Sequence, residues 1–204
     1  MKLLTQELIG EGILKTPSII EAFEKIDRKD FVPEEIKNKA YLNAPLPIGF
    51  GQTISQPFTV AFMLELLQPE KGNKILDVGS GSGWQTALLC SVVGDSGAVF
   101  AIELIPELMA FGRKNVAKYD FIKKGIAEFH SFNAIKGFPE KAPFDRIISA
   151  AAGSELPMAW KEQLKTDGRI VAPIKDAIHL FIKKTETDFE EQIHPGFAFV
   201  PLVS

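Results

Sequence analysis

Apolar positions change from helical spacing to short alternating runs near residue 70. Between Ser18 and Ile26 apolar side chains recur three and four residues apart, which predicts a helix. Residues 57–67 repeat that spacing and predict a second helix, with Pro57 in its first turn and Ser55 as its N-cap. We therefore expect a helical N-terminal segment over residues 1–70.

From residue 71 onward, short apolar runs alternate with helical patterns. The runs predict strands over residues 74–78, 98–102, 127–130, 144–149, 169–173, 178–183 and 197–202, and the stretches between them predict helices over residues 84–93, 106–118 and 157–164. Strands that alternate with helices indicate a doubly wound, mostly parallel α/β sheet covered on both faces. The closely spaced last strands indicate an antiparallel edge. We expect one domain over residues 1–204, with its core in residues 71–204.

The stretch over residues 43–57 fits neither pattern. It contains three prolines and two glycines interleaved with the apolar residues Leu46, Ile48 and Ile54. This composition predicts an irregular loop with apolar anchors, and its length is typical of a functional segment.

Composition argues against several classes of protein. The 204 residues hold 23 Lys and Arg against 26 Asp and Glu, a formal net charge of -3, which argues against a broad nucleic-acid surface. The single cysteine, Cys90, lies in an apolar helical stretch and is expected to be buried, and no zinc-ligand spacing occurs, so no metal site is expected. No long apolar run suggests a membrane span or a signal peptide. We expect a cytoplasmic monomer that binds neither nucleic acid nor a membrane.

The strongest local motif is Asp77-Val78-Gly79-Ser80-Gly81-Ser82-Gly83, where the first core strand turns into a helix. Glycines allow a sharp turn and a close approach of ligand, and ligands bind at the carboxyl ends of strands in open α/β sheets. Glu103 ends the next strand, where its carboxylate can accept both ribose hydroxyls of an adenosine ligand. Because the spacing is not the dinucleotide Gly-x-Gly-x-x-Gly, it favours S-adenosylmethionine over NAD. Asp77 is expected to hydrogen-bond the ligand's ammonium, directly or through water. A glycine-rich turn without a ligand is the alternative.

A second motif is the run Gly51-Gln52-Thr53-Ile54-Ser55-Gln56-Pro57. Together with the glycine turn, it resembles the protein-L-isoaspartate O-methyltransferase family. The resemblance covers nearly the whole chain, with further matches at residues 142–145, 150–151, 155–157, 163–164 and 199–202. It implies a seven-stranded Rossmann-like methyltransferase fold. It also implies methyl transfer from S-adenosylmethionine to the α-carboxylate of L-isoaspartyl residues in damaged proteins, which initiates repair through a succinimide.

The resemblance also implies roles for individual residues. Ser55 is the expected catalytic serine, and Thr53, Ile54 and Ser55 form the expected acceptor site. The glycine turn would hold the methionine end of the cofactor and Glu103 its ribose. The full expected cofactor set is Asp77, Gly79, Ser80, Gly81, Gly83, Glu103, Leu104, Asn133 and Ala134. A carboxylate acceptor is already ionised near pH 7, so no strong general base is needed. The spacing alone would make Ser55 a plain helix cap.

The chain departs from the family after the third predicted strand. The family usually has Gly-Asp-Gly where this chain has Phe132-Asn133-Ala134. Asn133 keeps a carbonyl that can accept from the adenine amino group, whereas Phe132 either stacks on the ring or occludes it. Ala134 would cost about 1 kcal/mol if its φ were positive. Two alternatives therefore stay open: a same-fold S-adenosylmethionine-binding protein with weak activity, and a methyltransferase with a different acceptor.

Overall fold

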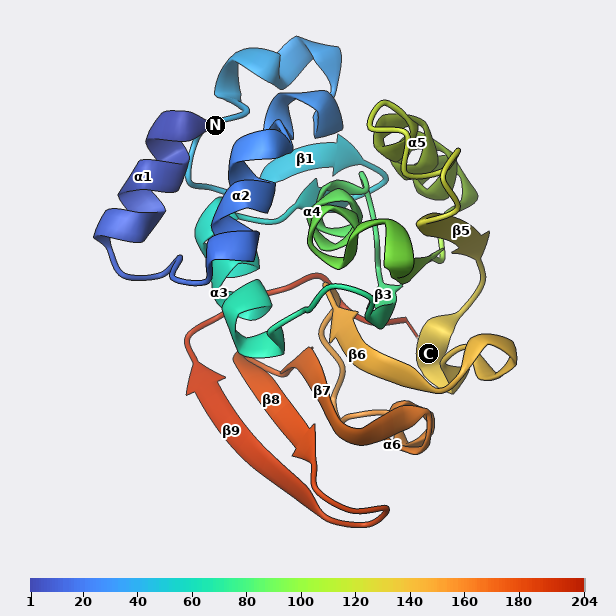
Figure 1. Cartoon of the computed structure of the whole chain (residues 1–204). Helices are drawn as coiled ribbons and strands as arrows, with labels where there is room; N and C mark the ends of the chain where they lie inside the picture. Colours follow the sequence, from blue (N-terminus) through green and yellow to red (C-terminus); the bar gives the residue numbers. More distant parts are fainter. Residues whose placement is uncertain (204) are drawn as a thin grey trace.

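A computed structural model describes residues 1–203, and a seven-stranded sheet forms its centre (Figure 1). The strand order is β5-β4-β3-β6-β7-β8-β9. Neighbouring strands are parallel from β5 to β7, while the β7–β8 and β8–β9 pairs are antiparallel. The strands are β3 (Lys74–Val78), β4 (Ala98–Glu103), β5 (Ala127–Ser131), β6 (Phe144–Ser149), β7 (Leu164–Ile174), β8 (Ala177–Lys183) and β9 (Phe189–Pro195). The predicted α/β class and its antiparallel edge are confirmed.

Alternate strand residues point to opposite faces of the sheet, and both sets are apolar here. Helices therefore cover both faces. The helices are α1 (Lys2–Gly10), α2 (Pro17–Lys25), α3 (Pro57–Leu67), α4 (Trp84–Val93), α5 (Pro106–Ala117) and α6 (Met158–Glu162). One apolar cluster joins the buried residues of α3, α4 and α5 to Ile75, Val99 and Ile148 of the strands. A second cluster joins Leu76 and Val78 to Trp160 of α6 on the other face. In Figure 1 the N-terminal helices α1 and α2 lie on the side of α3 and α4, and α2 contacts both.

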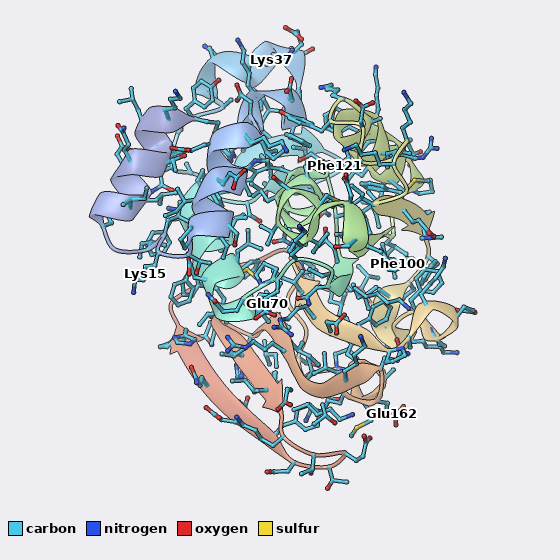
Figure 2. The ribbon with its side chains drawn as sticks, viewed as in Figure 1. Lys15, Lys37, Glu70, Phe100, Phe121 and Glu162 are labelled. Carbon is cyan, nitrogen blue, oxygen red and sulfur yellow. The ribbon has the colours of Figure 1, made fainter. Side chains whose placement is uncertain are left out.

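Side chains divide clearly between the interior and the periphery. Figure 2 shows Phe100 and Phe121 among packed side chains, whereas Lys15 and Glu162 project from the edge of the molecule. Cys90 is buried, as its apolar surroundings predict. Among residues 1–203, no helix is long and apolar enough to cross a membrane.

The prediction of a last strand over residues 197–202 is wrong. The edge strand is β9, an exposed run rich in Glu and Gln that pairs with β8. Its polar side chains face solvent at the sheet edge, so they carry no apolar alternation. The apolar residues 197–202 instead form an irregular tail that returns across the sheet. Ala152 and Pro201 form an isolated bridge, and Figure 1 shows the tail ending beside the segment that follows β5.

The prediction of an irregular loop over residues 43–57 is also wrong in part. The loop contains a small antiparallel hairpin of β1 (Leu46–Gly49) and β2 (Gln52–Ile54). Leu46, Ile48 and Ile54 point into the core, while Thr53 is exposed. This alternation explains why apolar anchors recur in a segment rich in proline and glycine.

Ser55 is not the N-cap of α3. Gln56 occupies the N-cap position and makes no side-chain cap hydrogen bond. The N–H of Phe58, in the first turn of α3, donates instead to Asn43 Oδ1 at 3.0 Å. Asn43 lies far from α3 in sequence, so local spacing could not identify it as the cap. The Ser55 side chain is therefore not engaged by the helix.

Candidate active site

A cavity lies at the carboxyl ends of β3, β4, β5 and β6, and we call it the sheet-edge cavity. Four strand-end segments, the β1–β2 hairpin and the C-terminal tail contribute to its wall. The residues that bear on its chemistry are Thr53, Gly79, Gly81, Glu103, Leu104, Phe132, Asn133, Ala134, Ala150 and the tail residues 200–203. Most of the expected cofactor set is thus brought together in one place.

Glu103 is held by the backbone at the floor of this cavity. Its Oε2 accepts from Gly81 N–H at 2.8 Å, and its Oε1 accepts from Ile105 N–H at 3.1 Å. The side chain is only 8% exposed. Each carboxylate oxygen retains acceptor capacity beyond these bonds. Glu103 is therefore a preorganised acceptor for a pair of hydroxyl groups.

Asp77 does not reach the cavity wall. Leu76 and Val78 point to the face covered by α6, so the side chain of Asp77 between them points to the opposite face, which α4 covers. There Gln85 Nε2 and Thr86 Oγ1 donate to its two carboxylate oxygens at 2.8 and 2.6 Å. Burial raises the pKa of Asp77 to about 6, although these two hydrogen bonds act against the rise. The position indicates that Asp77 anchors the start of α4.

Gly83 also lies away from the cavity. Its φ is +86°, and a Cβ at this position would stand 2.8 Å from Gly112 O and 2.9 Å from Val116 Cγ2. L-residues rarely adopt that conformation, and atoms of α5 already fill the position that a Cβ would take. The last glycine of the turn thus permits α4 and α5 to pack closely.

A second, open cavity runs beside the tail, and we call it the tail groove. It is lined by Pro45, Thr53, Ser55, Gln56, Phe58, Thr59, Ala150 and residues 195–200. Within the described part of the chain, this lining contains no charged side chain. Thr53 and Ala150 also line the sheet-edge cavity, so the two cavities meet at these residues.

A third and smaller cavity, the inner cavity, lies at the start of α4. Ser55, Ser80, Trp84 and Gln85 line it, and Thr53 and Ala150 line it too. Ser80 Oγ and Trp84 Nε1 are buried and have no hydrogen-bond partner among residues 1–203. The first N–H groups of a helix also lack partners within the helix. Such groups favour an anionic ligand.

Comparison with known proteins identifies the family. Over residues 1–204 the chain matches the family model described as Protein-L-isoaspartate(D-aspartate) O-methyltransferase (PCMT). The chain belongs to this family. The protein-L-isoaspartate O-methyltransferase of Methanopyrus kandleri is 41% identical over 208 residues, covering 98% of this chain and 89% of the relative. The Thermococcus onnurineus protein of that name is 40% identical, covering 97% and 90%.

Solved PCMT structures share the fold. The Plasmodium falciparum PCMT, in complex with S-adenosyl-L-homocysteine, superposes with a TM-score of 0.89 at 24% identity, covering 99% of this chain and 97% of that chain. A second protein-L-isoaspartate O-methyltransferase gives a TM-score of 0.90 at 26% identity, and this chain covers 66% of it. The predicted activity, S-adenosylmethionine-dependent methylation of isoaspartyl residues, is confirmed by the family. The two alternatives are not favoured.

The segment Phe132-Asn133-Ala134 forms part of the wall of the sheet-edge cavity. Phe132 lines the sheet-edge cavity and meets Phe138 edge-on, with ring centroids 5.2 Å apart. Asn133 Oδ1 accepts from Ile135 N–H, and its Nδ2 donates to Val203 O. Ala134 is not among the positive-φ residues, so its replacement of glycine carries no backbone strain. Trp160 Nε1 donates to Ala134 O at 2.8 Å and fixes this turn.

The three predicted acceptor residues all line the inner cavity, but only two of them also line the tail groove. Thr53 and Ser55 line the tail groove, and the Ser55 hydroxyl makes no hydrogen bond to any described residue. Ile54, in contrast, is 4% exposed and belongs to the core, and it touches only the inner cavity.

Sequence reasoning missed the tail residues 200–203, Ala150 as a junction residue, and Arg28, whose buried guanidinium donates to Ser55 O. The tail was identified only as a match to the family and interpreted as a strand. For Arg28 no local signal exists, because its partners lie 12 to 27 residues away.

Proposed function

We propose that the sheet-edge cavity binds S-adenosylmethionine and that the tail groove binds the isoaspartyl segment of a damaged protein. The observation that carries this proposal is the junction of the two cavities. Thr53 and Ala150 line both, so a donor in one cavity and an acceptor in the other meet there. Holding two reactants in line in this way can lower a barrier by roughly 7–11 kcal/mol in favourable systems.

The residues of the sheet-edge cavity fit the parts of S-adenosylmethionine. When bound, this cofactor supplies an electrophilic methyl group on its sulfonium. Glu103 would accept from the two ribose hydroxyls, since backbone N–H groups already orient its carboxylate. Leu104, 43% exposed, and Phe132 would provide apolar contact for the adenine ring. Asn133 and Ala134 would border the ring edge.

The inner cavity would hold the carboxylate of the cofactor's methionine. Ser80 Oγ and Trp84 Nε1 are donors without partners among the described residues, and both line this cavity. Gly79 and Gly81 also line this cavity and place no side chain in it. A buried donor that gains a charged acceptor contributes about 1.5–3 kcal/mol.

Ser55 would orient the acceptor. Its hydroxyl is free to donate to the α-carboxylate, which is ionised at neutral pH because its reference pKa is near 4. No proton needs to be removed, so a serine without a histidine partner is sufficient. Thr53 would contribute a second hydroxyl from the junction.

We further infer that residues 1–204 act as one unit, as a cytoplasmic monomer without nucleic acid. Support for a single unit comes from the three cavities, whose walls combine residues of the N-terminal segment with residues of the core. The net charge of -3 supports an acceptor recognised in a local groove.

The Ser55→Ala variant tests the acceptor assignment. We expect kcat/KM for an isoaspartyl peptide to fall about 10- to 100-fold, because one hydrogen bond to a charged group is lost. The dissociation constant of S-adenosylmethionine should stay within threefold. Ser96→Ala, an exposed serine at the opposite end of β4, is the matched control. Unchanged turnover in Ser55→Ala would remove Ser55 from the site.

A further inference from the structure

Arg28 is a fully buried cation beneath the acceptor segment, with 0% exposure. Its guanidinium donates four hydrogen bonds, all to backbone carbonyls. Nη1 donates to Ala40 O at 2.7 Å and to Leu42 O at 3.2 Å, and Nη2 donates to Ala44 O and Ser55 O, each at 3.0 Å. One planar side chain thus ties together both ends of the segment that carries the hairpin and Ser55.

The charge of Arg28 is not neutralised by a carboxylate. No Asp or Glu within residues 1–203 forms an ion pair with it. A buried charge is normally paired, because removing it from water is costly. Burial lowers the pKa of Arg28 to about 10, so the guanidinium still carries its charge at neutral pH. The fold therefore holds this positive charge with backbone carbonyls and without a carboxylate among residues 1–203.

This charge lies close to Ser55, since Arg28 Nη2 donates to Ser55 O at 3.0 Å. The Arg28 guanidinium carbon stands 5.3 Å from the centre of the Trp84 ring, and Trp84 lines the inner cavity together with Ser55. The tail groove itself offers no charged side chain among the described residues. An ionised acceptor entering at Ser55 would therefore have Arg28 as a nearby buried cation. In a poorly solvated interior, opposite charges attract much more strongly than in water.

We propose that Arg28 is the positioning residue of the acceptor site. It holds the Ser55 segment in place, and its unpaired positive charge makes the site select an ionised α-carboxylate. This proposal rests on the proposed function of the tail groove. It predicts that the site distinguishes a carboxylate from an uncharged carboxamide of the same shape.

The test compares two peptides in competition binding to the full chain: an isoaspartyl peptide with its α-carboxylate, and the same peptide with an α-carboxamide. Arg28→Met removes the charge and all four hydrogen bonds. Arg28→Lys keeps the charge but cannot reproduce the planar fork. Lys183→Met is the control for the loss of a buried cation. Lys183 ends β8, donates to Leu164 O of β7 at 2.9 Å and forms an ion pair with Glu186, away from the three cavities.

We expect wild type and Lys183→Met to bind the carboxylate peptide at least tenfold more tightly than the carboxamide. Arg28→Met should lose most of that preference, so that the ratio of the two affinities falls toward one. Arg28→Lys should keep the preference but show a raised KM and a lowered kcat, because Ser55 is no longer held.

A merely structural role would lower the folded fraction without moving the ratio of the two affinities, so an unchanged ratio in folded Arg28→Met overturns the proposal. If Arg28→Met does not fold, Arg28→Lys decides: wild-type KM and kcat in that variant overturn the proposal equally. Failure of wild type to bind either peptide would instead contradict the proposed function of the groove.

Discussion

Asp77 illustrates how the direction of one side chain decides its role. Strand alternation turns it toward α4, where Gln85 and Thr86 bind its carboxylate. Burial raises its pKa in the folded state to about 6, above the ordinary value of 3.8. A raised folded-state pKa means that the folded protein binds the proton more tightly than the unfolded chain. Ionisation of Asp77 above pH 6 therefore opposes folding, and protonation below pH 6 favours it.

The Asp77→Asn variant should expose this linkage. Because the variant cannot titrate at this site, wild type should gain about 1 kcal/mol of unfolding free energy relative to it between pH 7.5 and pH 5. Urea denaturation of both proteins at the two pH values measures the difference. The contributions of all other titrating groups cancel, because both proteins contain them. A difference that stays constant with pH would show that Asp77 does not titrate in this range.

Trp84 combines a packing role with an unused donor. Its ring meets Phe23 edge-on at 5.6 Å and lies against Arg28, while its Nε1 has no partner among residues 1–203. Trp84→Phe keeps an aromatic ring and removes the donor. We expect the dissociation constant of S-adenosylmethionine to rise about 10- to 100-fold, since a hydrogen bond to a charged group is lost. Calorimetric titration measures this constant, and an unchanged value would assign Trp84 to packing alone.

At the scale of elements, the turn between β3 and α4 has two functions. Its first glycines border the cavities, and Gly83 allows α4 to pack on α5. Both β3 and α4 were predicted with their observed bounds, because apolar runs and the glycines between them are local signals in the sequence. The packing role of Gly83 depends on Gly112, which local spacing does not identify.

Gly83→Ala separates the cost of backbone strain from the cost of packing. Gly12 also has a positive φ, +71°, but a Cβ there would meet nothing within 4 Å. Gly12→Ala should therefore cost about 1 kcal/mol of unfolding free energy from strain alone. Gly83→Ala should cost about 2–4 kcal/mol, because its Cβ also collides with Gly112 and Val116. Equal losses in urea denaturation would contradict this packing role.

The elements that sequence reasoning placed wrongly share one cause. β9 is a polar edge strand, the hairpin of β1 and β2 is short and rich in proline and glycine, and the tail is apolar without being a strand. In each case the contact that decides the structure is distant in sequence. Asn43 as the cap of α3 and Arg28 as the anchor of Ser55 are further examples.

At the scale of the whole molecule, the site forms where three distant parts of the chain meet. The hairpin supplies Thr53, the turn after β6 supplies Ala150, and the tail closes over both cavities. Sequence motifs identified most of the cofactor residues, because they lie at strand ends. They could not show that the tail forms a wall, or that Asp77 and Gly83 face α4 and α5. Those facts follow only from the packed arrangement.

The most direct test of the account is methyl transfer from labelled S-adenosylmethionine to a matched pair of peptides. One peptide contains an isoaspartyl residue, and the other contains aspartate at the same position. We predict that label appears as a methyl ester on the isoaspartyl peptide, with little or none on the aspartyl peptide. Equal labelling of both peptides, or no labelling of the isoaspartyl peptide, would contradict the account.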